Sequence, residues 1–289
     1  MKLGVSSYCY HRLVKEGKFT LFDAIEHARK TGFDVIEFSD FDPPQGKTLE
    51  QFAGELAKAC GNSGIGVCNY ATHADFIYGS GGDMKKEVQR VKSRVDVAKI
   101  LGVPLMRHDA CWGLKEGSPC RTWRDAAALM APAIREVTEY AASLGIRTMT
   151  ENHGTFLQDS ARMEELVLKV NHPNYGLLVD IGNFMCADET SVNALVTTMP
   201  YAFHVHAKDF LYKRGTELKP DDSWFPTRGG NFLRGTILGH GVVSVAQCIA
   251  YIKNTGYAGV LSLEFEGPEE PLYAIQRGYE YLKRFSGDA

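Results

Sequence analysis

Hydrophobic positions along this chain fall into two alternating patterns. Short runs rich in Val, Ile, Leu and Phe, with little polar alternation, are typical of parallel strands that are buried on both faces. The longer segments between them carry apolar residues at helical spacing. We predict strands at 3–8, 35–39, 66–70, 104–108, 147–151, 176–180, 203–208 and 260–265. We predict helices at 21–30, 48–60, 84–101, 125–144, 160–170, 192–198 and 245–254.

Glycines mark the ends of several predicted helices. Gly32, Gly102, Gly145 and Gly256 each stand between a helical segment and the strand that follows it. Glycine suits the left-handed position that terminates a helix. These glycines support a repeated strand–helix unit.

Strands that alternate with helices pair in parallel through right-handed crossovers, and eight such units can close into a barrel. The alternative is a doubly wound open sheet, which normally carries a glycine-rich phosphate loop after its first strand. No such loop follows the first strand here, where the residues are SSYCYH. We therefore predict an α/β fold, a single (β/α)₈ TIM barrel over residues 1–289, with a long irregular mouth loop at about 211–243.

Composition narrows the class of partner. The net charge is −3 and no cluster of Lys or Arg is strong enough to follow a phosphate backbone, so nucleic acid is not expected as a partner. No apolar stretch approaches the roughly 20 residues needed to cross a bilayer, and no signal peptide pattern opens the chain. The seven cysteines form no C-x-x-C pair, which indicates reduced thiols. We expect a cytoplasmic protein with no membrane partner, and a homo-oligomer stays open.

Polar residues at the ends of four neighbouring predicted strands carry the candidate chemistry. Glu151 ends the fifth strand, Asp180 the sixth, His206 lies near the end of the seventh, and Glu264 near the end of the eighth. The active site of a barrel of this kind lies where the strands end. Three carboxylates in one cleft would repel each other without a cation. This oxygen-rich set with one nitrogen predicts one divalent metal ion, Mn²⁺ first, with Mg²⁺ or Co²⁺ as alternatives.

The motifs around these residues resemble those of a known family. They are Glu151-Asn152-His153-Gly154, Asp180-Ile181-Gly182-Asn183, His204-Val205-His206-Ala207-Lys208-Asp209, Arg234-Gly235-Thr236 with Gly239-His240-Gly241, and Leu263-Glu264-Phe265-Glu266. With these motifs the chain resembles the sugar phosphate isomerase/epimerase family of xylose isomerase-like barrels over essentially its whole length. The family includes ketose 3-epimerases, inosose and dehydroshikimate dehydratases and hydroxypyruvate isomerase.

The resemblance implies metal-assisted proton abstraction next to a carbonyl, through an enediolate, on a small sugar-like or polyol-like substrate. Glu151, Asp180, His206 and Glu264 would hold the metal, and Glu151 and Glu264 would also act as base and acid. We therefore expect an isomerase or epimerase. The same parts would serve a lyase that dehydrates a keto-inositol type of substrate or eliminates a C- or O-linked group from a 3-keto sugar. Asn183 stands where ketose epimerases often carry His, and this departs from the epimerase pattern.

Two residues beside the metal ligands have competing interpretations. His108, at the end of the fourth strand, is a candidate general acid or base that would favour a lyase, or else a histidine paired with Asp109. Lys208 shares a strand face with His206 and would bind substrate and stabilise an oxyanion, or else form a salt bridge.

Three further residues are candidates for substrate binding. Arg234 matches a substrate-binding Arg of the family, or else anchors the mouth loop. Glu37, at the end of the second strand, would accept sugar hydroxyls, or else form a structural pair. His153, in the motif that begins at Glu151, is also expected to contact substrate.

Two other functional classes are built on this kind of barrel. An abasic-site endonuclease shares this barrel in the same superfamily, but it gathers three zinc ions with many His ligands and a basic surface. A non-catalytic binding protein on a barrel scaffold is the other class, since a fold does not guarantee a function. The complete set of four ligands argues against the second class.

Overall fold

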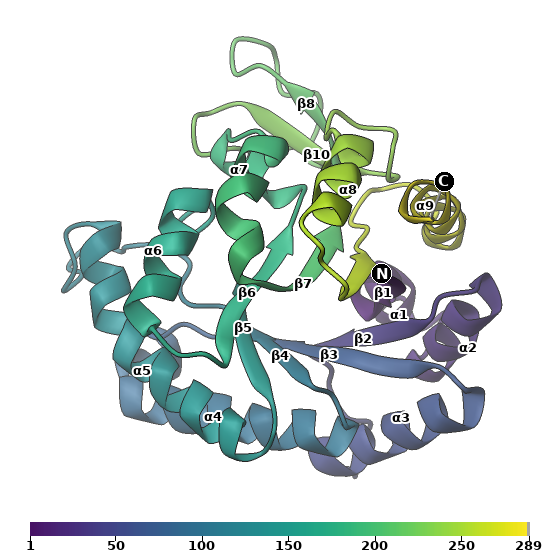
Figure 1. Ribbon diagram of the computed structural model, residues 1–289, viewed down its shortest axis with the longest axis horizontal. Helices are drawn as coiled ribbons and strands as arrows, with labels where there is room; N and C mark the ends of the chain where they lie inside the picture. Colours follow the sequence, from purple (N-terminus) through teal and green to yellow (C-terminus); the bar gives the residue numbers. More distant parts are fainter. Residues whose placement is uncertain (288–289) are drawn as a thin grey trace.

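Eight parallel strands form a closed barrel in the computed structural model, which describes residues 1–287 (Figure 1). The strands are β1 Lys2–Ser6, β2 Val35–Ser39, β3 Gly66–Thr72, β4 Leu105–His108, β5 Arg147–Glu151, β6 Tyr175–Asp180, β7 Ala202–Ala207 and β11 Val260–Leu263. Their order around the barrel is β1-β11-β7-β6-β5-β4-β3-β2. The predicted (β/α)₈ barrel is confirmed.

Helices surround the barrel and follow its strands in the chain. They are α1 His11–Lys15, α2 Leu21–Thr31, α3 Leu49–Ser63, α4 Met84–Leu101, α5 Trp123–Ser143, α6 Ser160–Val170, α7 Ser191–Thr198, α8 Val245–Asn254 and α9 Pro271–Ser286, with short 3₁₀ helices η1 Ser7–Tyr10, η2 Gly79–Gly82, η3 Asn183–Ala187 and η4 Met199–Tyr201. The sequence pattern did not predict α1 or α9. No helix in residues 1–287 is both long enough and apolar enough to cross a membrane.

The helix ends follow local chemistry. Thr20, Thr48 and Thr122 each begin a helix with a reciprocal capping box, in which two otherwise unpaired N–H groups are satisfied. At the other end, Gly32 and Gly102 adopt φ angles of 109° and 74°, as predicted for helix-terminating glycines.

Strand alternation decides which side chains reach the barrel interior, since neighbouring residues point to opposite faces. On β5, the Thr148 hydroxyl lies 2.7 Å from that of Thr138 on α5, so Thr148 points outward to the helix layer. Met149 and Glu151 therefore point into the barrel. Residues that pair in register on neighbouring strands point to the same face of the barrel. The pairings with β5 therefore show which residues of β4 and β6 point into the barrel.

The segment predicted as an irregular mouth loop instead contains a small antiparallel sheet. Its strands are β8 Asp209–Lys213, β9 Phe225–Pro226 and β10 Phe232–Thr236, in the order β8-β10-β9. In Figure 1, β8 and β10 project beyond the barrel beside α7 and α8. The alternation of this segment is interrupted by Gly, Asp and Pro, and for this reason its pattern did not predict strands.

One buried carboxylate ties this mouth sheet to the loop that follows it. Asp209 accepts hydrogen bonds from the backbone N–H groups of Gly239 and Gly241, both at 2.9 Å, of Val243 at 3.0 Å and of Phe210 at 2.9 Å. A Cβ atom at Gly241 would lie 2.2 Å from the Asp209 carboxylate, so only glycine fits this close approach. Asp209 therefore anchors the loop that leads into α8.

We expect Asp209→Ala to lower the free energy of unfolding by about 2 to 4 kcal/mol, because it leaves several buried N–H groups without an acceptor. Urea unfolding followed by circular dichroism would measure the change. Asp209→Asn keeps one acceptor oxygen and should lose less. Equal stability of the alanine variant and the original chain would contradict this role.

Candidate functional site

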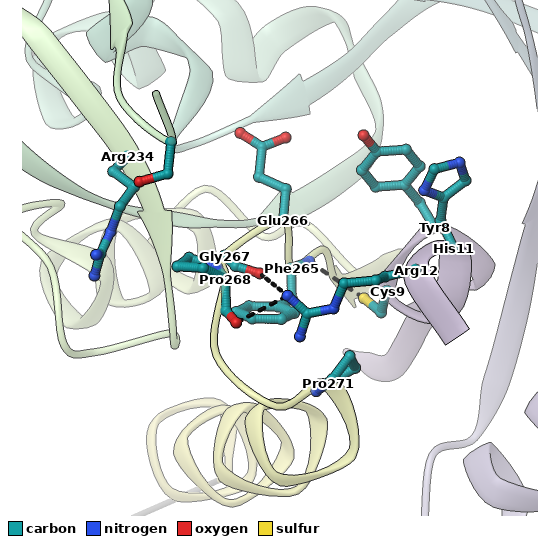
Figure 2. Close-up of a pocket in the computed structure, with 11 residues that line it drawn as sticks. Tyr8, Cys9, His11, Arg12, Arg234, Phe265, Glu266, Gly267, Pro268 and Pro271 are labelled. Atoms are coloured by element: carbon teal, nitrogen blue, oxygen red, sulfur yellow. Dashed lines mark hydrogen bonds between the residues drawn. The ribbon is translucent and has the colours of Figure 1, made fainter. Parts of the chain in front are cut away.

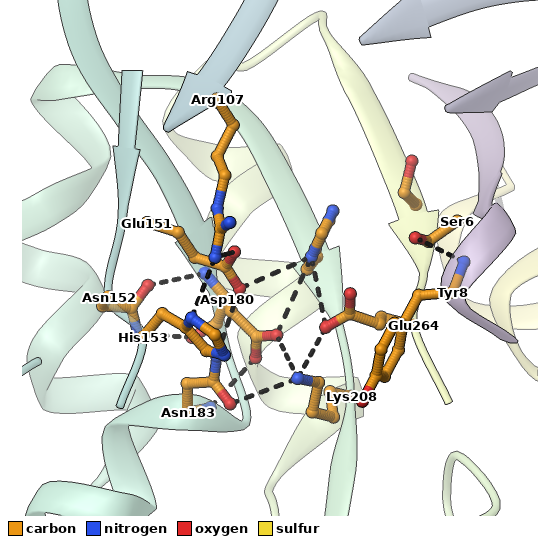
Figure 3. A network of polar contacts seen from close by, with 12 residues as sticks. Ser6, Tyr8, Arg107, Glu151, Asn152, His153, Asp180, Asn183, Lys208 and Glu264 are labelled. Atoms are coloured by element: carbon orange, nitrogen blue, oxygen red, sulfur yellow. Dashed lines mark hydrogen bonds and ion pairs between the residues drawn. The ribbon is translucent and has the colours of Figure 1, made fainter. Parts of the chain in front are cut away.

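Two hollows open where the barrel strands end. The central cavity has a volume of about 420 Å³, and its wall includes Glu37, Glu151, His206, Lys208 and Glu264. Figure 3 shows polar contacts of Glu151, Lys208 and Glu264. The side pocket, of about 290 Å³, lies next to it (Figure 2). Tyr8, His11 and Glu266 line both hollows. The two hollows are therefore adjacent at the end of the barrel.

The four predicted ligands converge at the floor of the central cavity. Glu151, Asp180, His206 and Glu264 each offer one ligand atom, and these atoms all lie within 4.8 Å of one another. His206 Nδ1 is 3.5 Å from a Glu264 oxygen, 3.7 Å from a Glu151 oxygen and 3.9 Å from an Asp180 oxygen. All four residues lie at or directly after the ends of adjacent strands β5, β6, β7 and β11, as predicted.

Asp180 is held so that one of its oxygens faces this cluster. Its Oδ1 accepts hydrogen bonds from the N–H groups of Gly182 and Asn183, and the Asn152 side chain bonds both its backbone N–H and its carbonyl. Its Oδ2 is buried and makes no hydrogen bond, although Lys208 Nζ lies 3.3 Å away. Burial, with Glu264 and Glu151 nearby, raises the pKa of Asp180 to about 6 although Lys208 lowers it.

A divalent cation fits this arrangement of donors. His206 Nδ1, like Asp180 Oδ2, is buried and has no hydrogen-bond partner, and both atoms belong to the same cluster. Buried polar atoms are normally satisfied, so unpaired atoms that converge on one point call for a ligand. Three carboxylates and one imidazole are suitable donors for Mn²⁺ or a similar ion.

Glu37 lies in the wall of the central cavity, and its carboxylate is paired with two histidines. Its two oxygens lie 2.6 Å from His206 Nε2 and 2.8 Å from His204 Nε2, and the residue is only 1% exposed. Although burial opposes it, His206 and His204 lower the pKa of Glu37, which keeps the carboxylate charged. Glu37 therefore orients His206 from the side opposite the ligand cluster, which is the structural pair that the sequence left open.

Lys208 reaches into the ligand cluster. Its Nζ is 2.5 Å from Glu264, 3.3 Å from Asp180 and 3.4 Å from Glu266. Although burial opposes it, these carboxylates raise the pKa of Lys208 and keep it protonated. The residue lines the central cavity, where its charge faces any molecule that enters.

Arg107 was not predicted and is a central member of the site. Its guanidinium lies 2.7 Å from Glu151 Oε2 and 2.8 Å from Asp109 Oδ1, and its side chain is almost fully buried. Burial opposes the charge, yet Asp109 and Glu151 raise the pKa of Arg107. An arginine inside a predicted buried strand was the available signal, because a buried charge needs a partner.

His108 faces away from the site, so its predicted role as general acid or base is wrong. It pairs in register with Thr150 on the outward face of the barrel, and its ring packs against Phe76 and Tyr175. Burial lowers its pKa to about 4. Arg107, one residue earlier, takes the inward position, so an error of one residue in strand alternation produced the wrong candidate.

His153 and Asn183 differ in their access to the cavity. His153 lines it, with Nδ1 3.1 Å from Asp109 Oδ1 and its ring edge-on to Trp112 at 4.9 Å. Asn183 does not line it. Its amide donates to Glu151 at 3.1 Å and accepts from Lys208 at 3.3 Å, so its predicted contact with substrate gives way to a role in positioning these two groups.

Arg234 lies in the side pocket and not in the central cavity. One of its terminal nitrogens is 3.5 Å from Glu269 Oε1, and its guanidinium carbon is 5.7 Å from the centre of the Trp224 ring. Its Nε is buried and has no hydrogen-bond partner. Any substrate contact of Arg234 is therefore with a part of the molecule that extends beyond the ligand cluster.

Known proteins share this architecture over nearly the whole chain. The chain is 24% identical over 219 residues to inosose dehydratase 1 of Bacillus cereus, a match that covers 74% of this chain and 66%, just under two thirds, of that protein. It is 23% identical over 292 residues to a putative L-ribulose-5-phosphate 3-epimerase of Shigella dysenteriae, covering 95% of this chain and 92% of that protein. A solved structure of the IOLI protein with a zinc atom has a TM-score of 0.76 at 18% identity and covers 99% of this chain and 98% of that chain. The model of the xylose isomerase-like TIM barrel family matches residues 25–285, and the chain belongs to this family.

Proposed function

We propose that this protein is a divalent-cation-dependent isomerase or epimerase that moves a proton at a carbon next to a carbonyl in a sugar-like compound. The observation that carries the proposal is the convergence of four ligand atoms within 4.8 Å beside the central cavity. Two relatives that match the chain are named inosose dehydratase and L-ribulose-5-phosphate 3-epimerase. A small molecule also suits a cavity of about 420 Å³.

The cation is held by Glu151, Asp180, His206 and Glu264 in this proposal. Arg107 and Lys208 bring two positive charges, but they also face Asp109 and Glu266, so the mouth keeps an excess of negative charge. Oxygen donors with one imidazole favour Mn²⁺, with Mg²⁺ or Co²⁺ as alternatives. When bound, the cation would polarise the substrate carbonyl and stabilise negative charge on its oxygen.

The two glutamates of the cluster supply the proton chemistry. Glu151 and Glu264 come from strands separated by β6 and β7 in the barrel, so their carboxylates approach the cavity from different sides. One removes the proton next to the carbonyl and becomes protonated, and the other, protonated beforehand, delivers a different proton to the carbon skeleton. Arg107 and Asn183 hold Glu151, while Lys208 contacts Glu264, so both carboxylates are oriented before substrate arrives.

A lyase is the second candidate, and one contact favours it. His153 lines the central cavity, and its Nδ1 lies 3.1 Å from Asp109 Oδ1 and 3.0 Å from an Arg107 nitrogen, so the ring is held in place and, when protonated, it could donate a proton to a leaving group. In this alternative the protein eliminates water from a keto-inositol type of substrate, or a linked group from a 3-keto sugar. His153 replaces His108 as the residue that separates the two reactions.

The remaining alternative, an abasic-site endonuclease, has less support. Within residues 1–287 the clusters of potential ligands are the four-residue set and the set of Glu37, His204 and His206, and the two share His206. The net charge of −3 also provides no basic surface for DNA.

Glu37→Gln is predicted to weaken metal binding by about 10- to 100-fold, the usual cost of losing a carboxylate that orients a ligating histidine. Glutamine is uncharged, so the ion pairs of Glu37 with His204 and His206 would be lost. Isothermal titration of the metal-free protein with Mn²⁺ would measure the affinity.

Ser262→Ala is the matched control. It removes a hydroxyl 3.0 Å from His204 Nε2 and leaves the contact between Glu37 and His206 intact. Its Mn²⁺ affinity should stay close to that of the original chain. Unchanged affinity in Glu37→Gln would remove the orienting role from Glu37.

Glu151→Gln and Glu264→Gln should each slow carbon–proton exchange by about 10²-fold or more, because each removes a group that carries the proton. The assay incubates Mn²⁺-loaded protein with a panel of ketoses, keto-inositols and 3-keto glycosides in deuterated water. Deuterium on carbon, read by NMR and mass spectrometry, reports proton abstraction, and the product separates epimerase from lyase.

His108→Gln serves as the control for this experiment, because His108 packs on the outward face of the barrel. It should keep the exchange rate even where it lowers stability. Full activity in Glu264→Gln would defeat the proposed mechanism.

A further inference from the structure

The central cavity and the side pocket lie next to each other and share part of their lining. Tyr8, His11 and Glu266 line both hollows. The Tyr8 and His11 rings are stacked, with centroids 5.4 Å apart and planes 17° apart, and Tyr8 is 39% exposed. An exposed, flat ring pair beside a sugar site is a surface on which a second ring can pack.

Hydrogen bonds from Arg12 fix the part of the side pocket that Gly267 and Pro268 line. Arg12 donates hydrogen bonds to the carbonyl oxygens of Gly267, at 3.5 Å, of Pro268, at 2.8 Å, and of Glu269. Figure 2 shows this guanidinium beneath Glu266, facing the turn that contains Gly267 and Pro268. Because its N–H groups are used by the protein backbone, Arg12 shapes the pocket and is a poor partner for a charged ligand.

The charges around the side pocket are balanced. Arg12 and Arg234 are accompanied by Glu266 in the wall and by Glu269, whose carboxylate contacts Arg234. The start of α9, where Pro271 lines the pocket, is already capped by the Glu270 carboxylate, which accepts from the N–H groups of Leu272 and Tyr273. A phosphate group would therefore meet neither a free pair of arginines nor an open helix N-terminus.

The lining of the side pocket combines polar and apolar groups. Ser223 and the Arg234 side chain line it together with Tyr8 and with apolar Phe265 and Pro268. Polar groups beside apolar and aromatic ones suit an uncharged ring that carries oxygen atoms.

We propose that the side pocket is a second subsite that binds an uncharged, ring-bearing substituent of the substrate. The substrate is then a glycoside-like compound, with its reacting sugar in the central cavity and its second ring over Tyr8 and His11, and not a phosphorylated monosaccharide. This inference rests on the proposed function only in placing the reacting sugar beside the ligand cluster.

Binding of unreactive probes tests the subsite without any turnover. The Mn²⁺-loaded protein is titrated with methyl β-D-glucoside, phenyl β-D-glucoside and glucose 6-phosphate by isothermal calorimetry. We expect the phenyl glucoside to bind about tenfold more tightly than the methyl glucoside, as expected for one packed aromatic ring. Glucose 6-phosphate should bind no more tightly than the methyl glucoside.

Ser223→Trp fills the side pocket, because Ser223 lines it without lining the central cavity. This variant should lose the preference for the phenyl group and keep its affinity for the methyl glucoside. Asp222→Trp is the matched control, since the neighbouring Asp222 side chain is fully exposed, and it should keep the preference.

Three results would overturn the subsite: tighter binding of the sugar phosphate, a phenyl preference that survives Ser223→Trp, or no measurable binding of any probe. The deuterium exchange assay tests the proposed reaction separately from the subsite. A phenyl preference without exchange would remove the proposed reaction and leave the subsite in place.

Discussion

Repulsion among three buried carboxylates is the constraint on which the site depends. Two like charges 4 Å apart repel by about 4 kcal/mol at an effective dielectric constant of 20, and Glu151, Asp180 and Glu264 converge within such distances. The barrel forces this approach, since parallel strands end at the same rim. Arg107 and Lys208 offset part of the repulsion, and the unpaired atoms of Asp180 and His206 show that the offset is incomplete. In the proposed function, a bound cation would complete it.

The same constraint explains the residues behind the ligands. A ligating imidazole needs its other nitrogen held, and Glu37 does this from the barrel interior. A ligating carboxylate needs one oxygen kept free, and the N–H groups of Gly182 and Asn183 take up the other oxygen of Asp180. Stability and function are therefore linked here, because the groups that satisfy buried polar atoms also aim the ligand atoms.

Sequence alone was enough for the barrel and for the meeting of Glu151, Asp180, His206 and Glu264, because both depend on short-range signals. Strand and helix periods alternate regularly, and each ligand lies at a strand end. The roles of Glu37 and His108 could not be predicted from these short-range signals. Strand alternation in β4 is ambiguous over four residues, and the partner of Glu37 comes from β7, about 170 residues later. The side pocket combines segments near residues 12, 234 and 267, and no local pattern reports such a meeting.

Substrate choice and reaction type depend more on the residues around the rim of the central cavity, such as His153, than on the cluster of Glu151, Asp180, His206 and Glu264. In the proposed mechanism, the four-residue cluster and its two glutamates would support proton abstraction next to any suitably placed carbonyl. What differs between an epimerase and a lyase is whether a second group can protonate a departing atom, and His153 is held by Asp109 within the cavity wall. Arg107 contacts both His153, at 3.0 Å, and Glu151, at 2.7 Å, so the candidate acid and the candidate base share one charged partner. A change at Arg107 would therefore alter both proton-transfer groups together, which makes this arginine the physical connection between the metal cluster and the rim.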